Sequence, residues 1–234
     1  MVFSFLQKTP YIAIIGDIKD SKKLENRNMI QNQLKQVFEM INETYCADIS
    51  SKFLITLGDE FQGLLHNGAN ALTIIHEIEG KMFPVKMRFG IGVGEITTDI
   101  DKDIPLGADG PAYYNARIAI EGLKAEEKKN MSVSSDIRIE IDKENYDSAR
   151  FMNTIFSLLT AIKNSWTIRQ REIIFDMMKH QNSQVEAAKR FNIRQSSIHK
   201  NLTKGNYYTF CDALHTIDQA LGEIKREQGG LNVY

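Results

Sequence analysis

Three features are scarce or missing in this sequence of 234 residues, and each absence excludes a class of protein. The chain has only two cysteines, Cys46 and Cys211, without Cys or His at zinc-site spacing, so we expect neither a zinc site nor a disulfide framework. No run approaches the ~20 apolar residues that span a bilayer, and the N-terminus lacks the basic start and apolar core of a secretory signal. The formal net charge of -1 gives no overall attraction to nucleic acid or membranes. We therefore expect a soluble, cytoplasmic protein with no membrane partner, in which any nucleic-acid binding comes from a local patch.

An acidic turn between two apolar runs is the most distinctive stretch that is present. Residues 52–65 read KFLITLGDEFQGLL, in which the apolar runs flank Gly58, Asp59 and Glu60. The pattern predicts two buried strands joined by a tight turn, because Gly58 can adopt backbone angles closed to other residues. Carboxylates at such a tip are held in place by the sheet and are open to solvent or to a metal ion. An ordinary acidic turn has the same composition, so a second nearby carboxylate is needed to indicate a site.

Strand and helix patterns alternate through the first 135 residues. Short β-branched or alternating runs predict strands, and apolar residues at helical spacing predict helices. In chain order we predict a strand at 11–15, a helix at 28–45, the hairpin, a helix at 70–82, a strand at 85–96, a helix at 111–129 and a last strand at 131–135. The charged run at the end of the third helix, 124–129, is expected to face solvent. The order predicts an α+β fold in the ferredoxin-like arrangement, with helices covering a mostly antiparallel sheet.

This topology would bring Asp17, which follows the first strand, beside Asp59 at the hairpin tip. Two carboxylates that lie close together repel each other unless a cation lies between them. Magnesium suits the arrangement, because its octahedral shell takes one or two carboxylates and fills its other positions with water and phosphate oxygens. We predict a magnesium or manganese site formed by Asp17, Asp59 and Glu60, at which a nucleoside triphosphate would bind.

Four motifs around these carboxylates carry a family resemblance. Residues 16–18 (GDI), with Ser21, and residues 57–59 (LGD) resemble the two metal motifs of class III nucleotidyl cyclases. The hairpin also differs by one residue from the signature of GGDEF-type diguanylate cyclases, whose palm domain is related. Residues 88–94 (RFGIGVG) and 108–117 resemble the glycine-bearing strand and the following helix of both families. The resemblance implies a palm domain in the first 135 residues, and the predicted nucleotide contacts are Ser21, Lys22, Arg88, Asn115 and Arg117.

The chain departs from both families where they contact the base and the transition state. Ile55 stands where class III cyclases have a base-reading Lys, and Tyr113 where they have a transition-state Asn, with Asn115 two residues away. Leu57 and Ser21 stand where diguanylate cyclases have Gly and Phe. Because the metal motifs are kept and these contacts are not, the pattern favours nucleotide binding over efficient cyclisation, and slow catalysis is an alternative.

One long helix at 148–165 and a helix-turn-helix pattern are predicted after residue 140. Thr167 and Ser183 are predicted N-caps of two helices, and Asn192 stands where the following turn needs a left-handed residue. The stretch 187–202 resembles the helix-turn-helix of sigma factors and response regulators, which implies DNA binding. A small helical bundle with a solvated basic face is the alternative. The predicted DNA contacts are the outward donors of the last helix, Arg194, Gln195, Ser196, Ser197, His199, Lys200 and Lys204.

As a whole, the chain resembles the SatD family. We predict two domains, residues 1–140 and 141–234, with an α+β, ferredoxin-like palm domain followed by an all-α helix-turn-helix domain. The hypothesis that joins them is a homodimeric, nucleotide-responsive transcriptional regulator. Two alternatives are an active nucleotidyl cyclase or nucleotidyltransferase, and a degenerate palm that serves only as a dimerisation scaffold.

Overall fold

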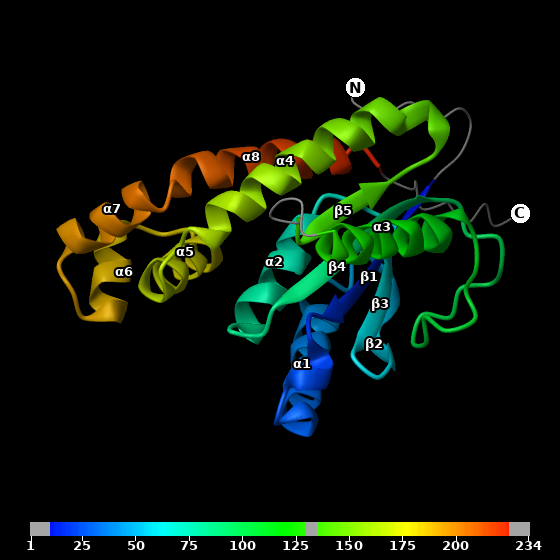
Figure 1. Cartoon of the computed structure of the whole chain (residues 1–234), viewed down its shortest axis with the longest axis horizontal. Helices are drawn as coiled ribbons and strands as arrows, with labels where there is room; N and C mark the ends of the chain where they lie inside the picture. Colours follow the sequence, from blue (N-terminus) through cyan, green and yellow to red (C-terminus); the bar gives the residue numbers. More distant parts are fainter. Residues whose placement is uncertain (1–9, 130–134, 225–234) are drawn as a thin grey trace, which may run out of the picture.

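The computed structural model describes residues 10–129 and 135–224, and a mixed five-stranded sheet organises the first part of the chain (Figure 1). The strands are β1 (Tyr11–Ile18), β2 (Ile49–Leu57), β3 (Glu60–Leu65), β4 (Met87–Gly94) and β5 (Ile137–Glu140). The α-helices are α1 (Arg27–Thr44), α2 (Ala71–Met82), α3 (Pro111–Lys128), α4 (Tyr146–Asn164), α5 (Ile168–His180), α6 (Gln184–Phe191), α7 (Gln195–Lys204) and α8 (Tyr207–Leu221). Two 3-10 turns, Ser21–Lys23 and Lys143–Asn145, follow β1 and β5.

The sheet has the order β2-β3-β1-β4-β5, and β1 lies at its centre. All eight residues of β1 are buried, and β1 pairs antiparallel with both β3 and β4. The first six elements, β1-α1-β2-β3-α2-β4, follow the ferredoxin-like order, and β5 adds a parallel strand beside β4. The predicted α+β class is therefore confirmed. The last strand begins at Ile137, and residues 131–134, where we predicted it, lie outside the described residues.

Helices cover both faces of the sheet, and the alternation along β1 decides which side chains face which layer. Ile12 and Ile14 belong to the large core that includes side chains of α1 and α2, whereas Ala13 and Ile15 pack in a smaller cluster with α3. The glycine-bearing strand β4 lies under α3. A Cβ atom at Gly92 would lie 2.1 Å from the carbonyl oxygen of Ala112, so this glycine permits the close approach of the helix.

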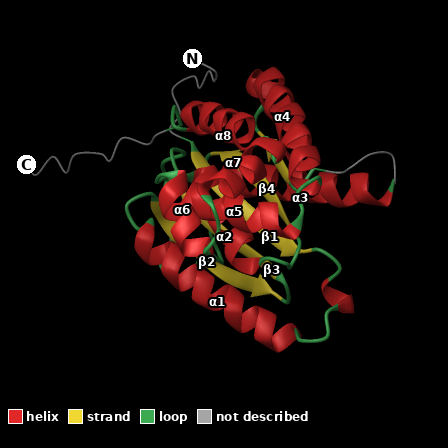
Figure 2. Cartoon of the chain, turned by 90° about the vertical axis from the view of Figure 1, so that its left-hand side faces the viewer, coloured by secondary structure: helices red, strands yellow, loops and turns green. Residues whose placement is uncertain are grey.

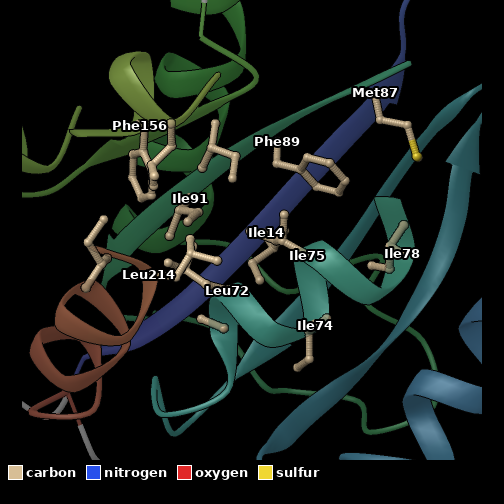
Figure 3. Packing of buried hydrophobic residues seen from close by; sticks show 14 of the residues in the cluster. Ile14, Leu72, Ile74, Ile75, Ile78, Met87, Phe89, Ile91, Phe156 and Leu214 are labelled. Carbon is tan, nitrogen blue, oxygen red and sulfur yellow. The ribbon is translucent and has the colours of Figure 1, made fainter. Parts of the chain in front are cut away.

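The C-terminal helices share the core of the sheet. Phe156 of α4 and Leu214 of α8 belong to the same hydrophobic cluster as Ile91 of β4 and Leu72 of α2, as Figure 3 shows. Helices α5, α6 and α7 lie beyond the sheet, at one end of the molecule (Figures 1 and 2). The domain boundary that we placed after residue 140 stays a prediction. One hydrophobic cluster includes residues from both sides of it.

Local capping predicted from the sequence is present at α5 to α7. Thr167 forms a capping box with Gln170, and Ser183 accepts a hydrogen bond from the backbone N–H of Glu186. Asn192 has a φ of 50°, the left-handed conformation that ends α6 before α7 begins. Among residues 10–129 and 135–224, the structure has no helix with the length and apolar character needed to cross a membrane.

Candidate functional site

The end of β1 and the tip of the β2–β3 hairpin meet at one edge of the sheet. In the β1–β3 register the last pair is Gly16 opposite Phe61, so Asp17 directly follows this pair on β1 and Glu60 directly precedes it on β3. Asp59 occupies the turn, which Gly58 closes with a φ of 64°. Gly16 is needed here for packing, since a Cβ atom would lie 2.2 Å from the ring of Phe61. The register therefore brings together the two motifs that carry the predicted metal ligands.

Asp17 is buried on the face covered by α3, with only 6% of its surface exposed. Lys124 Nζ lies 3.1 Å from its Oδ2, and Arg88 Nε lies 3.5 Å from its Oδ1. Burial raises the pKa of Asp17 above its ordinary value, against the opposing charges of Arg88 and Lys124, and the nearby charge of Asp59 raises it further. Its Oδ1 is buried without a hydrogen bond. Asp17 is thus a carboxylate with an acceptor left unsatisfied.

Two other predicted site residues are already bound within the chain. Glu60 accepts hydrogen bonds from both terminal nitrogens of Arg117, at 2.6 and 2.7 Å. Asn115 donates to the carbonyl of Val93 at 2.8 Å, and so holds α3 against β4. In this arrangement Glu60 and Asn115 already have partners within the chain.

The remaining predicted nucleotide contacts lie at the border of the same edge. Ser21 and Lys22 form the 3-10 turn after β1, where Ser21 is half-buried and Lys22 is exposed. Two positions that depart from the class III cyclase pattern hold packing residues, whereas Leu57, which departs from the diguanylate cyclase pattern, is 79% exposed. Tyr113 is buried against β1, and Ile55 packs against the large core. These two side chains fill space in the fold.

An extended network of ion pairs runs from Asp17 towards the C-terminal helices. Arg88 Nε lies 3.3 Å from Oε2 of Glu127, and Oε1 of Glu127 lies 2.5 Å from Lys19 Nζ. Lys19 Nζ also lies 2.8 Å from Asp136, and the other carboxylate oxygen of Asp136 lies 2.8 Å from Nζ of the buried Lys163 of α4. Lys163 also pairs with Glu79 of α2. Our expectation that residues 124–129 face solvent as one charged run was wrong for Lys124 and Glu127, because packing of α3 on the sheet pairs them with β1 and β4.

The candidate DNA-contacting residues lie on and before α7, at one end of the long axis of the molecule (Figure 1). Ile198 and Leu202 are buried, which turns the other side of α7 outward. Gln195 also bonds Gln184 of α6 at 2.9 Å. Ser197 is half-buried, and the exposed members of the predicted set are Arg194, Gln195, Ser196, His199, Lys200 and Lys204.

The end of β1 and the hairpin tip, with Asp17, Asp59 and Glu60, form what we call the Asp17 edge. A divalent cation fits this edge by the chemistry of its donors. Asp17 has a buried oxygen without a hydrogen bond, and Asp59 makes no hydrogen bond or ion pair within residues 10–129 and 135–224. Carboxylate oxygens are the ligands that Mg²⁺ and Mn²⁺ prefer. The described residues contain no cluster of three or more His, Cys, Asp and Glu side chains suited to a metal ion. Magnesium needs only one or two carboxylates when phosphate oxygens complete its shell.

Comparison with known proteins identifies a family and several structures that are similar over part of the chain. The SatD family model matches residues 11–211. No curated protein matches the chain. The catalytic core of a rhodopsin-guanylyl cyclase with converted specificity, solved with ATPαS, is 16% identical over 60% of this chain and 80% of its own, at a TM-score of 0.36.

Two further structures match to a similar extent. The monomeric guanylyl cyclase domain of RhoGC from the aquatic fungus Blastocladiella emersonii is 14% identical over 61% of this chain and 86% of its own, at a TM-score of 0.39. The adenylyl cyclase CyaB from P. aeruginosa is 14% identical over 61% of this chain and 81% of its own, at a TM-score of 0.38. Similarity at this level does not establish a shared activity.

Proposed function

We propose that this chain, which belongs to the SatD family, binds a magnesium or manganese complex of a nucleoside triphosphate at the Asp17 edge and transfers or cyclises its nucleotidyl group. The observation that carries the proposal is the β1–β3 register, which brings Asp17 beside the hairpin tip that holds Asp59. In the proposed reaction a hydroxyl oxygen attacks the α-phosphorus and pyrophosphate leaves. A bound metal ion would polarise the phosphoryl oxygens and favour deprotonation of the attacking hydroxyl.

The chain's own residues would have distinct roles in this site. Asp17 and Asp59 would hold the metal ion, and the half-buried Arg88 would keep the Asp17 carboxylate in position. Lys124 and Arg117 have side chains that are 26% and 45% exposed, so each can reach phosphate oxygens. Glu60 would position Arg117 through its two hydrogen bonds. The departures at Ile55 and Tyr113 support a base preference and a rate unlike those of the cyclases that the motifs resemble.

Calorimetry with each of the four ribonucleoside triphosphates, with and without Mg²⁺, tests the proposal. We expect Mg²⁺-dependent binding of at least one triphosphate, and pyrophosphate release with it. Asp17→Asn should weaken binding by about 10- to 100-fold, because one charged contact contributes about 1.5–3 kcal/mol. Asp99→Asn, at an exposed aspartate of the loop before α3, is the matched control and should bind as the wild type does. Equal affinities for both variants, or no binding of any triphosphate, would contradict the proposal, and the second result would favour the dimerisation scaffold.

DNA binding by a homodimer is a second candidate function, and the geometry of α6 and α7 favours it. The left-handed Asn192 joins two short helices, and six of the seven predicted DNA contacts are exposed. Such an arrangement suits a recognition helix, and two half-sites would require two copies of the chain. Joined to the first proposal, it describes a nucleotide-responsive transcriptional regulator.

A further inference from the structure

A pocket of about 970 Å³ lies between α2, α5 and α8, and no residue of the Asp17 edge lines it. Ligand pockets of small molecules have volumes of about 300–1,000 Å³ and mostly apolar walls with a few placed polar groups. Leu72 of α2, Phe175 of α5 and Leu214 of α8 contribute apolar wall here. Leu72 and Leu214 also belong to the core drawn in Figure 3, so the pocket borders the region where α8 joins the sheet layer.

His76 is a polar group of this pocket that has an acceptor to spare. Only 6% of its surface is exposed, and its Nδ1 lies 2.8 Å from the carbonyl oxygen of Leu72. Because a carbonyl only accepts, Nδ1 must carry the proton, which leaves Nε2 as an acceptor. Burial lowers the pKa of His76, which keeps its ring neutral. Nε2 has no hydrogen bond within the parts of the chain that the structure describes.

Several other polar groups that line the pocket interact within the protein. Asp218 accepts hydrogen bonds from the backbone N–H of Leu72 and from the hydroxyl of Thr73. The Tyr207 hydroxyl interacts with the thiol of Cys211 one helical turn away. The lining residues carry both signs of charge, with the exposed Lys81 and Lys179 against the half-buried Asp176 and Asp218, so the pocket has no preference for an ion of one sign. Besides these charged side chains, the pocket offers Nε2 of His76 as an acceptor next to its apolar walls.

We propose that this pocket binds a small, uncharged and largely apolar molecule that donates one N–H or O–H hydrogen bond to Nε2 of His76. Its occupant would touch α2 of the sheet layer together with α5 and α8, and would stabilise the contact between them. The site is separate from the Asp17 edge and does not depend on the function proposed for that edge.

Fluorescence titration with N-phenyl-1-naphthylamine tests the site, because this probe is neutral and largely apolar and has a single N–H donor. Its matched partner, 1-phenylnaphthalene, has the same body without the donor. We expect both to bind the wild-type chain, the amine about tenfold more tightly because its N–H donates to Nε2 of His76. Saturating ATP with Mg²⁺ should displace neither probe. A wild-type chain that binds neither probe at up to about 100 μM, or binds both equally, would overturn the proposal.

Three variants locate the binding. Cys211→Trp on α8 fills the pocket and should abolish binding of both probes, whereas Asp212→Trp, at the exposed neighbouring position, should leave it unchanged. His76→Phe keeps the ring and removes the acceptor, so the advantage of the amine should disappear. Circular dichroism melting of each variant confirms folding, and if His76→Phe does not fold, the tryptophan pair and the two probes still decide the outcome. Equal binding by both tryptophan variants, or an advantage of the amine that persists in His76→Phe, would show that the probe binds elsewhere and would overturn the proposal.

Discussion

Asp218 is a carboxyl group that α8 holds over the start of α2, where it accepts from the backbone N–H of Leu72 at 3.3 Å. Burial raises its pKa to about 7 from an ordinary value of 3.8, against the hydrogen bonds that favour its charged form. Between these pH values the folded chain binds more protons than the unfolded chain. The free energy of unfolding that Asp218 contributes therefore falls as pH rises from about 4 to about 7.

Replacing this carboxyl group with an amide should remove its pH dependence. Asp218→Asn keeps an acceptor for Leu72 and cannot ionise, so we expect it to raise the free energy of unfolding at pH 8 by on the order of 1–3 kcal/mol. At pH 4 the difference from wild type should be close to zero. Urea denaturation at pH 4, 6 and 8 measures this, with the exposed Asp212→Asn of the same helix as control. A difference that is the same at pH 4 and pH 8 would refute the account.

The packing of α4 depends on one buried cation. Lys163 is 4% exposed and pairs with Glu79 of α2 and Asp136 beside β5, so it joins three elements. Its backbone carbonyl also accepts from Arg171 of α5 at 2.8 Å, which fixes the start of the helices that follow. Removing one partner of a buried pair leaves an uncompensated charge, which costs far more than an exposed ion pair contributes.

Lys163→Met keeps the apolar stem and removes the charge, and should lower the free energy of unfolding by about 3–5 kcal/mol. Adding Glu79→Leu should recover part of the loss, since one fewer carboxylate is then unpaired. Urea denaturation of both variants measures the two effects. Lys179→Met, at an exposed lysine of α5, is the control and should change stability by less than about 0.5 kcal/mol. A loss for Lys163→Met as small as that of the control would mean that the network does not hold α4.

At the scale of the whole molecule, the outward face of α7 is the part of the chain to which we assign DNA contacts. The chain carries a formal net charge of -1, so attraction to phosphates must come from this local face. Lys200→Ala should weaken binding to a labelled duplex and reduce the slope of log K against log salt by about 1, the release of one counterion. Fluorescence anisotropy over a series of KCl concentrations measures both. Lys189→Ala, at an exposed lysine of α6, is the control, and identical slopes for the two variants would contradict the assignment.

The sequence by itself determined the local features of this protein. Gly58 and its flanking apolar runs predict the hairpin. Thr167 and Ser183 predict where α5 and α6 begin, and Asn192 predicts where α6 ends, because each depends on neighbours within a few residues. Alternation and helical spacing predict the α+β class, since they encode which face of each element is buried. The order of the elements was enough to predict that Asp17 and the hairpin tip share an edge.

Only the tertiary structure decided which side chains meet across long separations. Lys19 and Asp136 are 117 residues apart, and Lys163 and Glu79 are 84 apart, so no local pattern predicts either pair. The same holds for Gly92, since only the packing of α3 on β4 shows that the helix occupies the space above this glycine. Periodicity predicts that a residue is buried, but it does not predict which residue it contacts. That partner depends on how whole elements pack, and so on the sum of contacts over the entire core.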